Sequence, residues 1–193
     1  MMLGAIIGDI VGSRFEFDNH RSKDFELFAE GCFATDDSIM TLSVAKAIME
    51  TQREAADASA ANATGLSDAA EAEEAFYPRL RANAVYWMRS IGQHYPDCGY
   101  GGRFYWWMFI TDNPAPYDSF GNGAAMRVSP AGFAARSMEE ALALAKAVTE
   151  VTHNHPEGIK GAEATAVAVY MARIGHTQQE IAAHIVEHYY ALD

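Results

Sequence analysis

The chain has 193 residues, of which 14 are Lys or Arg and 26 are Asp or Glu, so its formal net charge is −12. Half of the residues are hydrophobic, which excludes extensive disorder and is typical of a soluble globular protein, and the length favours a single domain. The acidic balance argues against nucleic acid as a partner, because phosphate binding needs clustered Lys and Arg, but it suits hard divalent cations.

The two cysteines, Cys32 and Cys98, form no disulfide framework, so we expect a reducing, cytoplasmic setting. The apolar opening segment contains Asp9 and is far shorter than the ~20 residues that span a membrane. It also lacks the basic start and the small-residue cleavage site of a signal peptide. The sequence therefore predicts no membrane partner.

Helical spacing dominates the first half of the chain. Gly4, Gly8 and Gly12 share one face of an opening helix, and such a bare face predicts close packing against another helix. A helix follows residue 38 with an apolar stripe at intervals of four residues: Met40, Val44 and Ile48.

Residues 55–72 are small, polar and low in complexity, and they predict a flexible surface insertion within the single domain. A strong helix is expected from Glu73 to about Gly92. Its buried face consists of Phe76, Leu80, Ala84, Met88 and Ile91.

Residues 93–136 are rich in Gly, Pro and aromatic residues and have little periodicity, which is typical of a functional region. Beyond them, Ser137 with Glu140 and Thr177 with Glu180 predict capping boxes, and a helix runs between about Gly158 and Gly175. The last helix should bury Ile181, Ile185 and Tyr189. No sustained alternation of apolar and polar residues appears, so the predicted fold class is all-α.

The segment Thr35-Asp36-Asp37-Ser38 precedes a helix and allows two interpretations. Any of these side chains could cap the helix, and carboxylates suit the positive end of its dipole. Two adjacent carboxylates and a hydroxyl are also hard oxygen donors whose repulsion a divalent cation would relieve.

A second segment runs from Ser119 to Arg127 and contains Gly121-Asn122-Gly123. The glycines permit positive φ angles and a close approach of backbone N–H groups to a phosphate, although an ordinary tight turn fits as well. Arg127 could pair with phosphate or form a structural ion pair.

Other candidates are individually weak. His153 and His155 flank a helix end, where protonation is favoured, and either could be purely structural. The segment from Asp97 to Phe104 places glycines beside Tyr100, which fits either a wall that holds a planar ring or a glycine turn in the core. Trp106 and Trp107 are expected in the core. Glu16 alone would be a surface acid.

Taken together, these segments resemble the ADP-ribosylglycohydrolase family. The resemblance rests on GAIIGDIVGSRFEF, TDDSIMTLSVAKAI, the Asp97–Gly99 turn, SFGNGAAMRVSPAG and VTHNHPEGIKGAEA, which occur in the family's order. It implies a compact, orthogonal all-α bundle with a cleft for two Mg²⁺ ions, or Mn²⁺ in some members. It also implies release of ADP-ribose from a modified protein or small molecule.

The resemblance implies a role for each matching position. The metal ligands would be Thr35, Asp36 and Asp37, and the catalytic acids would be Glu16 and Asp97. The substrate would contact Ser119, Gly121, Asn122, Gly123, His153 and Tyr100, with His155 a weaker match.

The family pattern also includes a second metal motif, Asp-x-Asp-Thr, towards the C-terminus, and the 193 residues contain none. We therefore expect a C-terminally incomplete domain that binds one metal or none and has weak or no activity. Its uncovered surface would favour self-association or complementation by another chain. The alternative is a non-catalytic ADP-ribose-binding or structural relative.

Overall fold

The computed structural model describes residues 3–62 and 69–191, and within them every regular element is a helix, so the all-α prediction is confirmed. The α-helices are α1 (Leu3–Gly12), α2 (Asp36–Asn62), α3 (Ala69–Gly92), α4 (Gly102–Tyr105), α5 (Ser129–Ala134), α6 (Met138–Thr149), α7 (Pro156–Ile174) and α8 (Gln178–His188). Three shorter elements are the 3₁₀-helices η1 (Ser13–Phe15) and η3 (Ala125–Arg127) and the π-helix η2 (Trp106–Ile110).

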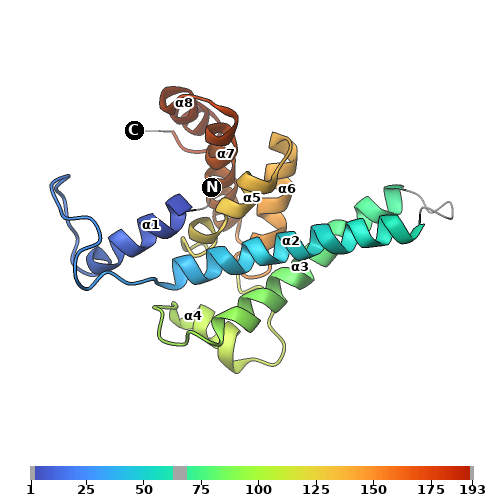
Figure 1. The fold of residues 1–193 in the computed structure, drawn as a ribbon, viewed down its shortest axis with the longest axis horizontal. Coiled ribbons are helices and arrows are strands. Elements are labelled where there is room, and N and C mark those ends of the chain that lie inside the picture. The colour runs from blue at the N-terminus through green and yellow to red at the C-terminus, as the bar shows by residue number, and fades with distance from the viewer. Residues whose placement is uncertain (1–2, 63–68, 192–193) are drawn as a thin grey trace.

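The long helices α2 and α3 pack against each other along their length and cross the middle of the molecule (Figure 1). The apolar stripe of α2 is buried, as predicted, because each of its three side chains faces this packing surface. On α3, Leu80, Ala84 and Met88 are fully buried, whereas Phe76 and Ile91 are half-buried at the edge of the core.

A second group of helices, α5, α6 and α7, packs on this pair, with α5 against α2 and α6 against α3 (Figure 1). Helices α5 and α7 approach so closely that a Cβ atom at Gly132 would lie 2.3 Å from the backbone oxygen of Ala166. Only glycine permits that approach. A pocket lies between the start of α2, the loops before α4 and η3, and the turn that joins α6 to α7.

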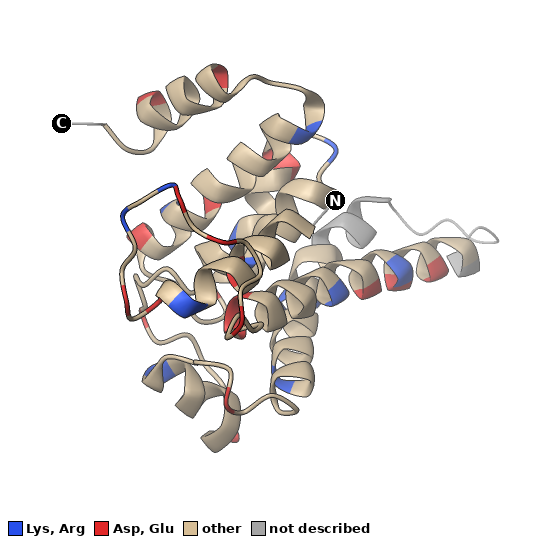
Figure 2. Cartoon of the chain, turned by 60° about the vertical axis from the view of Figure 1, so that its left-hand side comes forward, with Lys and Arg blue, Asp and Glu red and all other residues tan. Residues whose placement is uncertain are grey.

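The prediction of a flexible insertion at 55–72 is wrong for most of its residues. Helix α2 continues to Asn62 and α3 begins at Ala69, while residues 63–68 lie outside the described residues. The alanines of this segment have the highest helix propensity. Acidic and basic residues alternate along the projecting part of α2 (Figure 2), where Arg53 pairs with both Glu50 and Asp57. Among the described residues, no helix is both long and apolar enough to cross a membrane.

Helix α1 packs on the start of α2, but not through its glycines. Ideal Cβ atoms at Gly4, Gly8 and Gly12 would meet no other atom within 4 Å. The predicted close packing on this face is therefore wrong for the described residues. The polar side chain of Asp9 makes the contact instead.

In the C-terminal helices, one of the two predicted capping boxes is complete and the other is only half formed. Thr177 and Glu180 form the complete capping box, whereas Ser137 accepts a bond from the N–H of Glu140 but the Glu140 carboxylate turns to Arg136. No residue of α8 is fully buried, and the three predicted core positions of this last helix are half-buried. Trp107 is in the core as predicted, but 56% of Trp106 is exposed.

Candidate active site

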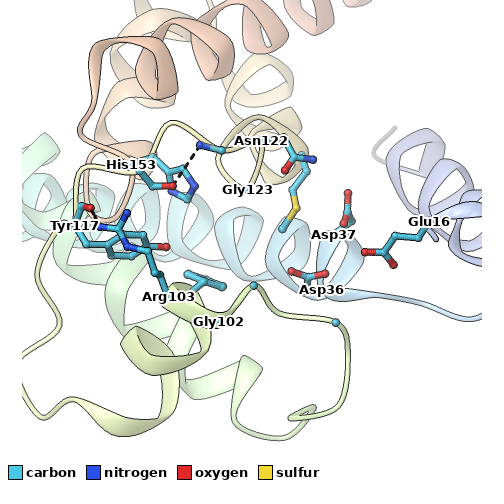
Figure 3. Close-up of a pocket in the computed structure, with 15 residues that line it drawn as sticks. Glu16, Asp36, Asp37, Gly102, Arg103, Tyr117, Asn122, Gly123 and His153 are labelled. Atoms are coloured by element: carbon cyan, nitrogen blue, oxygen red, sulfur yellow. Dashed lines mark hydrogen bonds between the residues drawn. The ribbon is translucent and has the colours of Figure 1, made fainter.

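A polar pocket of about 430 Å³ opens where α2, the loop before α4, the loop before η3 and the turn after α6 meet (Figure 3). It is lined by Glu16, Asp36, Asp37, Gly99, Gly101, Gly102, Arg103, Phe104, Tyr117, Ser119, Gly121, Asn122, Gly123, Met126 and His153. Eight predicted site residues therefore line one cavity, although they come from four separate segments of the chain.

The acidic end of the pocket is formed by the first turn of α2 and by Glu16. Asp36 is only 8% exposed, and burial, followed by the nearby Asp37 carboxylate, raises its pKa to about 7. Burial and the Asp9 carboxylate likewise raise the pKa of Asp37. Glu16 points towards both carboxylates at the same end of the pocket (Figure 3). These carboxylates are crowded and short of compensating positive charge.

Asp9 supports this end of the pocket from behind, and no motif in the sequence marks it as a site residue. Its carboxylate accepts hydrogen bonds from the N–H of Thr35 at 2.9 Å and from the Thr35 hydroxyl at 2.5 Å. It also accepts from the N–H of Ser38 at 3.2 Å and from the Ser38 hydroxyl at 2.5 Å. Asp9 therefore caps α2 together with Thr35 of the segment itself, whose hydroxyl accepts the N–H of Asp37 at 3.3 Å. The only early signal was an acid inside an otherwise apolar helix.

Thr35 is buried beside the pocket, with its hydroxyl 3.3 Å from Oδ2 of Asp37. The Thr35 hydroxyl donates its proton to Asp9 and accepts the N–H of Asp37, which leaves one lone pair for another partner. Capping and ligand binding, the two interpretations of this segment, are thus compatible.

The segment before α4 wraps the acidic end with backbone. The carbonyl of Cys98 accepts the N–H of Asp36 at 2.7 Å, and Gly99, at φ +95°, lies so close that its Cβ would be 3.5 Å from Oδ1 of Asp36. The structure does not bring Asp97 and Tyr100 into the pocket lining. Asp97 is exposed, and Tyr100 packs with the rings of Phe104 and Phe109.

The opposite end of the pocket carries a cation and an aromatic ring. The guanidinium of Arg103 lies 4.8 Å from the centre of the Tyr117 ring, and its Nη2 donates to the backbone oxygen of Tyr117. Neither residue was predicted, because no local pattern links positions separated by a turn, a helix and a loop. The pocket is therefore negative at one end and positive at the other.

The Gly-Asn-Gly loop lies between these ends. The sequence suggested positive φ angles at Gly121 and Gly123, but neither residue adopts one. Among the described glycines, positive φ angles occur at Gly31, Gly99 and Gly175. Glycine is needed at 123 for space, because a Cβ there would lie 3.1 Å from Nε2 of His153. The hydroxyl of Ser119 accepts a hydrogen bond from the N–H of Gly121 at 3.3 Å and so stabilises the loop conformation.

His153 is 4% exposed and closes the pocket beside this loop. Its Nδ1 lies 2.8 Å from the Thr152 hydroxyl. Burial, and then the charges of Arg127 and Arg103, lower its pKa to about 3. The expected protonation at a helix end is therefore wrong for His153, since desolvation outweighs the helix dipole. His155 lies outside the pocket and caps α7, its Nδ1 accepting the N–H of Glu157.

The sequence model of the ADP-ribosylglycohydrolase family matches residues 1–192, essentially the whole chain. The chain belongs to the ADP-ribosylglycohydrolase family. The resemblance drawn from the five segments is thereby confirmed, and the family is one of glycoside-cleaving hydrolases. A comparison with curated proteins found no match.

The donor atoms at the acidic end fit one side of a divalent-cation site in an ADP-ribosylglycohydrolase. Thr35, Asp36 and Asp37 offer hydroxyl and carboxylate oxygens, the ligands that Mg²⁺ prefers. Within the described part of the chain, however, no group of three or more His, Cys, Asp and Glu side chains is arranged to hold a metal ion.

Proposed function

We propose that this ADP-ribosylglycohydrolase-family chain is a metal-dependent hydrolase that cleaves the glycosidic bond between ADP-ribose and an acceptor. The observation that carries the proposal is the polarity of the pocket. Carboxylates gather at the end formed by Asp36, Asp37 and Glu16, while Arg103 and the field of the buried Arg127 lie towards the other end. ADP-ribose has matching parts, since its diphosphate is anionic and its terminal ribose is a diol.

Thr35, Asp36 and Asp37 are the residues that would hold the metal. A bound Mg²⁺ or Mn²⁺ ion would coordinate the ribose hydroxyls and polarise a water molecule. The raised pKa values of the two aspartates support this assignment, because a cation would restore the charged carboxylates that crowding disfavours.

The remaining residues act on the substrate directly. Glu16 lines the pocket beside the two aspartates and is the acid placed to accept a proton from the attacking water. Ser119, Asn122 and the backbone at Gly121 and Gly123 contact the diphosphate and ribose. The side chain of Arg103 pairs with the diphosphate and orders Tyr117 beside it. Asp97 and Tyr100 have no part in this proposal.

The test is release of free ADP-ribose from ADP-ribosylated protein and from small-molecule ADP-ribose conjugates, with Mg²⁺, with Mn²⁺ and with EDTA. We expect turnover that EDTA abolishes. Glu16→Gln should lower turnover by about 10²-fold or more, the usual contribution of a general base. Asp18→Asn, an exposed change two residues away, is the matched control. Turnover that survives EDTA would contradict the metal dependence.

A second function, ADP-ribose binding without hydrolysis, is favoured by the incomplete set of metal ligands among the described residues. Calorimetry with ADP-ribose distinguishes the two, because a binding module gives heat of binding without release of product. The absence of binding to both metal and nucleotide would favour a structural role.

A further inference from the structure

Arg127 is a buried cation next to the pocket, and neither of its expected roles describes it. The side chain is 1% exposed, and its guanidinium lies 5.3 Å from the centre of the Phe104 ring. Its Nε and Nη1 atoms have no hydrogen-bond partner among the described residues. Its Nη2 donates to the hydroxyl of Thr152 at 2.7 Å. Burying a charge in this way is costly, and charges that a protein nevertheless keeps buried cluster at functional sites.

The hydroxyl of Thr152 has one proton to donate. Since it already accepts from Arg127, that proton can go to Nδ1 of His153 at 2.8 Å or to the backbone oxygen of Thr149 at 3.4 Å. The backbone oxygen of Thr149 already accepts the N–H groups of Thr152 at 3.1 Å and of His153 at 2.9 Å, so the hydroxyl proton goes to the shorter contact with Nδ1. Nδ1 of His153 is then an acceptor, and in a neutral imidazole the proton must reside on Nε2.

Nε2 of His153 is the ring nitrogen on the pocket side. It lies beside Gly123, where a Cβ atom would be only 3.1 Å away, and both residues line the pocket. The imidazole is neutral because burial and the neighbouring Arg127 and Arg103 oppose its protonation. A neutral imidazole can therefore donate a hydrogen bond from Nε2–H to a ligand oxygen without placing another positive charge beside Arg127 and Arg103.

We propose that Arg127 is a positioning residue that acts through the Thr152 hydroxyl to hold His153 as the Nε2–H tautomer, ready to donate to an oxygen of ADP-ribose. The identity of this ligand rests on the proposed function, but the tautomer does not. Thr152 is well placed for the role, because its backbone oxygen also accepts the N–H of Tyr117 at 3.1 Å and fixes the pocket wall.

The first test measures the tautomer in the free protein. Two-dimensional ¹⁵N–¹H spectra of the imidazole groups at pH 7 report which nitrogen carries the proton, and His153→Gln assigns the signal. We expect a protonated Nε2 and an unprotonated Nδ1 for His153. A proton on Nδ1 would overturn the proposal, whether or not the protein binds ADP-ribose.

The second test removes the link. Thr152→Val deletes the hydroxyl at nearly constant shape, Thr152→Ser keeps it, and Thr149→Val is the matched control, since the buried Thr149 hydroxyl has no partner among the described residues. We expect Thr152→Val to mix the tautomers and to weaken ADP-ribose binding about tenfold, the value of one hydrogen bond. Thr152→Ser and Thr149→Val should behave as the wild type.

The outcomes separate the two claims. An unchanged tautomer in folded Thr152→Val would overturn the role of Thr152. If Thr152→Val does not fold, Thr152→Ser and the wild-type spectrum decide, because the proposal requires the Nε2–H form in both. If the wild type binds no ADP-ribose, the proposed function fails, while the spectra still judge the tautomer.

Discussion

The carboxylate of Asp9 accepts hydrogen bonds from both the backbone N–H and the hydroxyl of Thr35, which lies 26 positions later in the chain. Two more bonds from Ser38 reach the same carboxylate. One side chain of α1 therefore fixes the N-terminus of α2 and orients the hydroxyl that we propose as a metal ligand. The acidic end of the pocket is built by contact between two helices, not by its own segment alone.

Substituting Asp9 should destabilise the start of α2 more than substituting a single local capping residue, because Asp9 accepts four hydrogen bonds. Asp9→Asn puts an NH₂ group among four donors, so it should lower the free energy of unfolding by about 1–3 kcal/mol. Urea denaturation measures this change. Asp18→Asn, on the exposed loop after η1, should change it by less than about 0.5 kcal/mol. Equal stability of the two variants would show that the Asp9 contacts are not maintained in solution.

Asp36 should be a destabilising residue in the metal-free protein. Its pKa is raised, so the folded state resists ionisation that the unfolded state accepts, and stability decreases as the pH rises from about 4 to about 7. At pH 8 in EDTA, Asp36→Asn should therefore increase the free energy of unfolding by roughly 1–2 kcal/mol, a value reduced for solvent screening. The same variant should weaken Mg²⁺ binding in calorimetry.

The exposed Asp112→Asn is the control for this experiment, and it should alter neither stability nor Mg²⁺ affinity. A loss of stability in metal-free Asp36→Asn would mean that the carboxylate is held by favourable contacts, and the crowding argument would be wrong.

Gly158 should matter because of space rather than helix propensity. A Cβ there would lie 2.6 Å from the backbone oxygen of Ser119 and 3.2 Å from Cβ of His153. Gly158→Ala should therefore push the Ser119 loop away from His153 and weaken ADP-ribose binding tenfold or more, about 1.4 kcal/mol or above. Calorimetry measures the effect.

Gly161→Ala is a matched control on the same helix. Its Cβ would meet only the Tyr190 hydroxyl, at 3.5 Å, an ordinary contact. This variant should keep its ligand affinity and gain about 0.5–1 kcal/mol of stability from helix propensity. Equal binding losses in both variants would point to helix α7 as a whole and not to the Ser119 contact.

His153 should make the protein acid-sensitive. Its pKa is lowered to about 3, whereas an unfolded histidine titrates near 6.5, so between these pH values the unfolded state binds the extra proton. This stabilising contribution is present above pH 6.5 and is lost as the pH falls, with a slope of up to about 1.4 kcal/mol per pH unit. Asp36 contributes the opposite slope over part of this range, so the comparison with His153→Gln is required.

In denaturation series from pH 7 to pH 4.5, the stability of His153→Gln should rise relative to the wild type as the pH falls. His94→Gln, an exposed substitution, should run parallel to the wild type. Parallel curves for both variants would show that His153 is solvated.

The helices of this protein could be predicted because each carries its signal within a few turns. The stripes of α2 and α3 and the capping box of α8 are local patterns, and the structure retains them. The segment 55–72 was misjudged because small polar residues were interpreted as a loop, although alanine-rich sequence favours helix when a long neighbour such as α3 packs beside it.

For the pocket, the sequence by itself determined the chemistry of individual segments: two aspartates before a helix, a glycine-rich loop and a histidine after a helix. Tertiary structure alone decided that Asp9 supports Thr35, that Arg103 stacks on Tyr117, and that Arg127 reaches His153 through Thr152. It also decided that His153 is neutral, because a pKa depends on burial and on charges from distant segments, which no local pattern records.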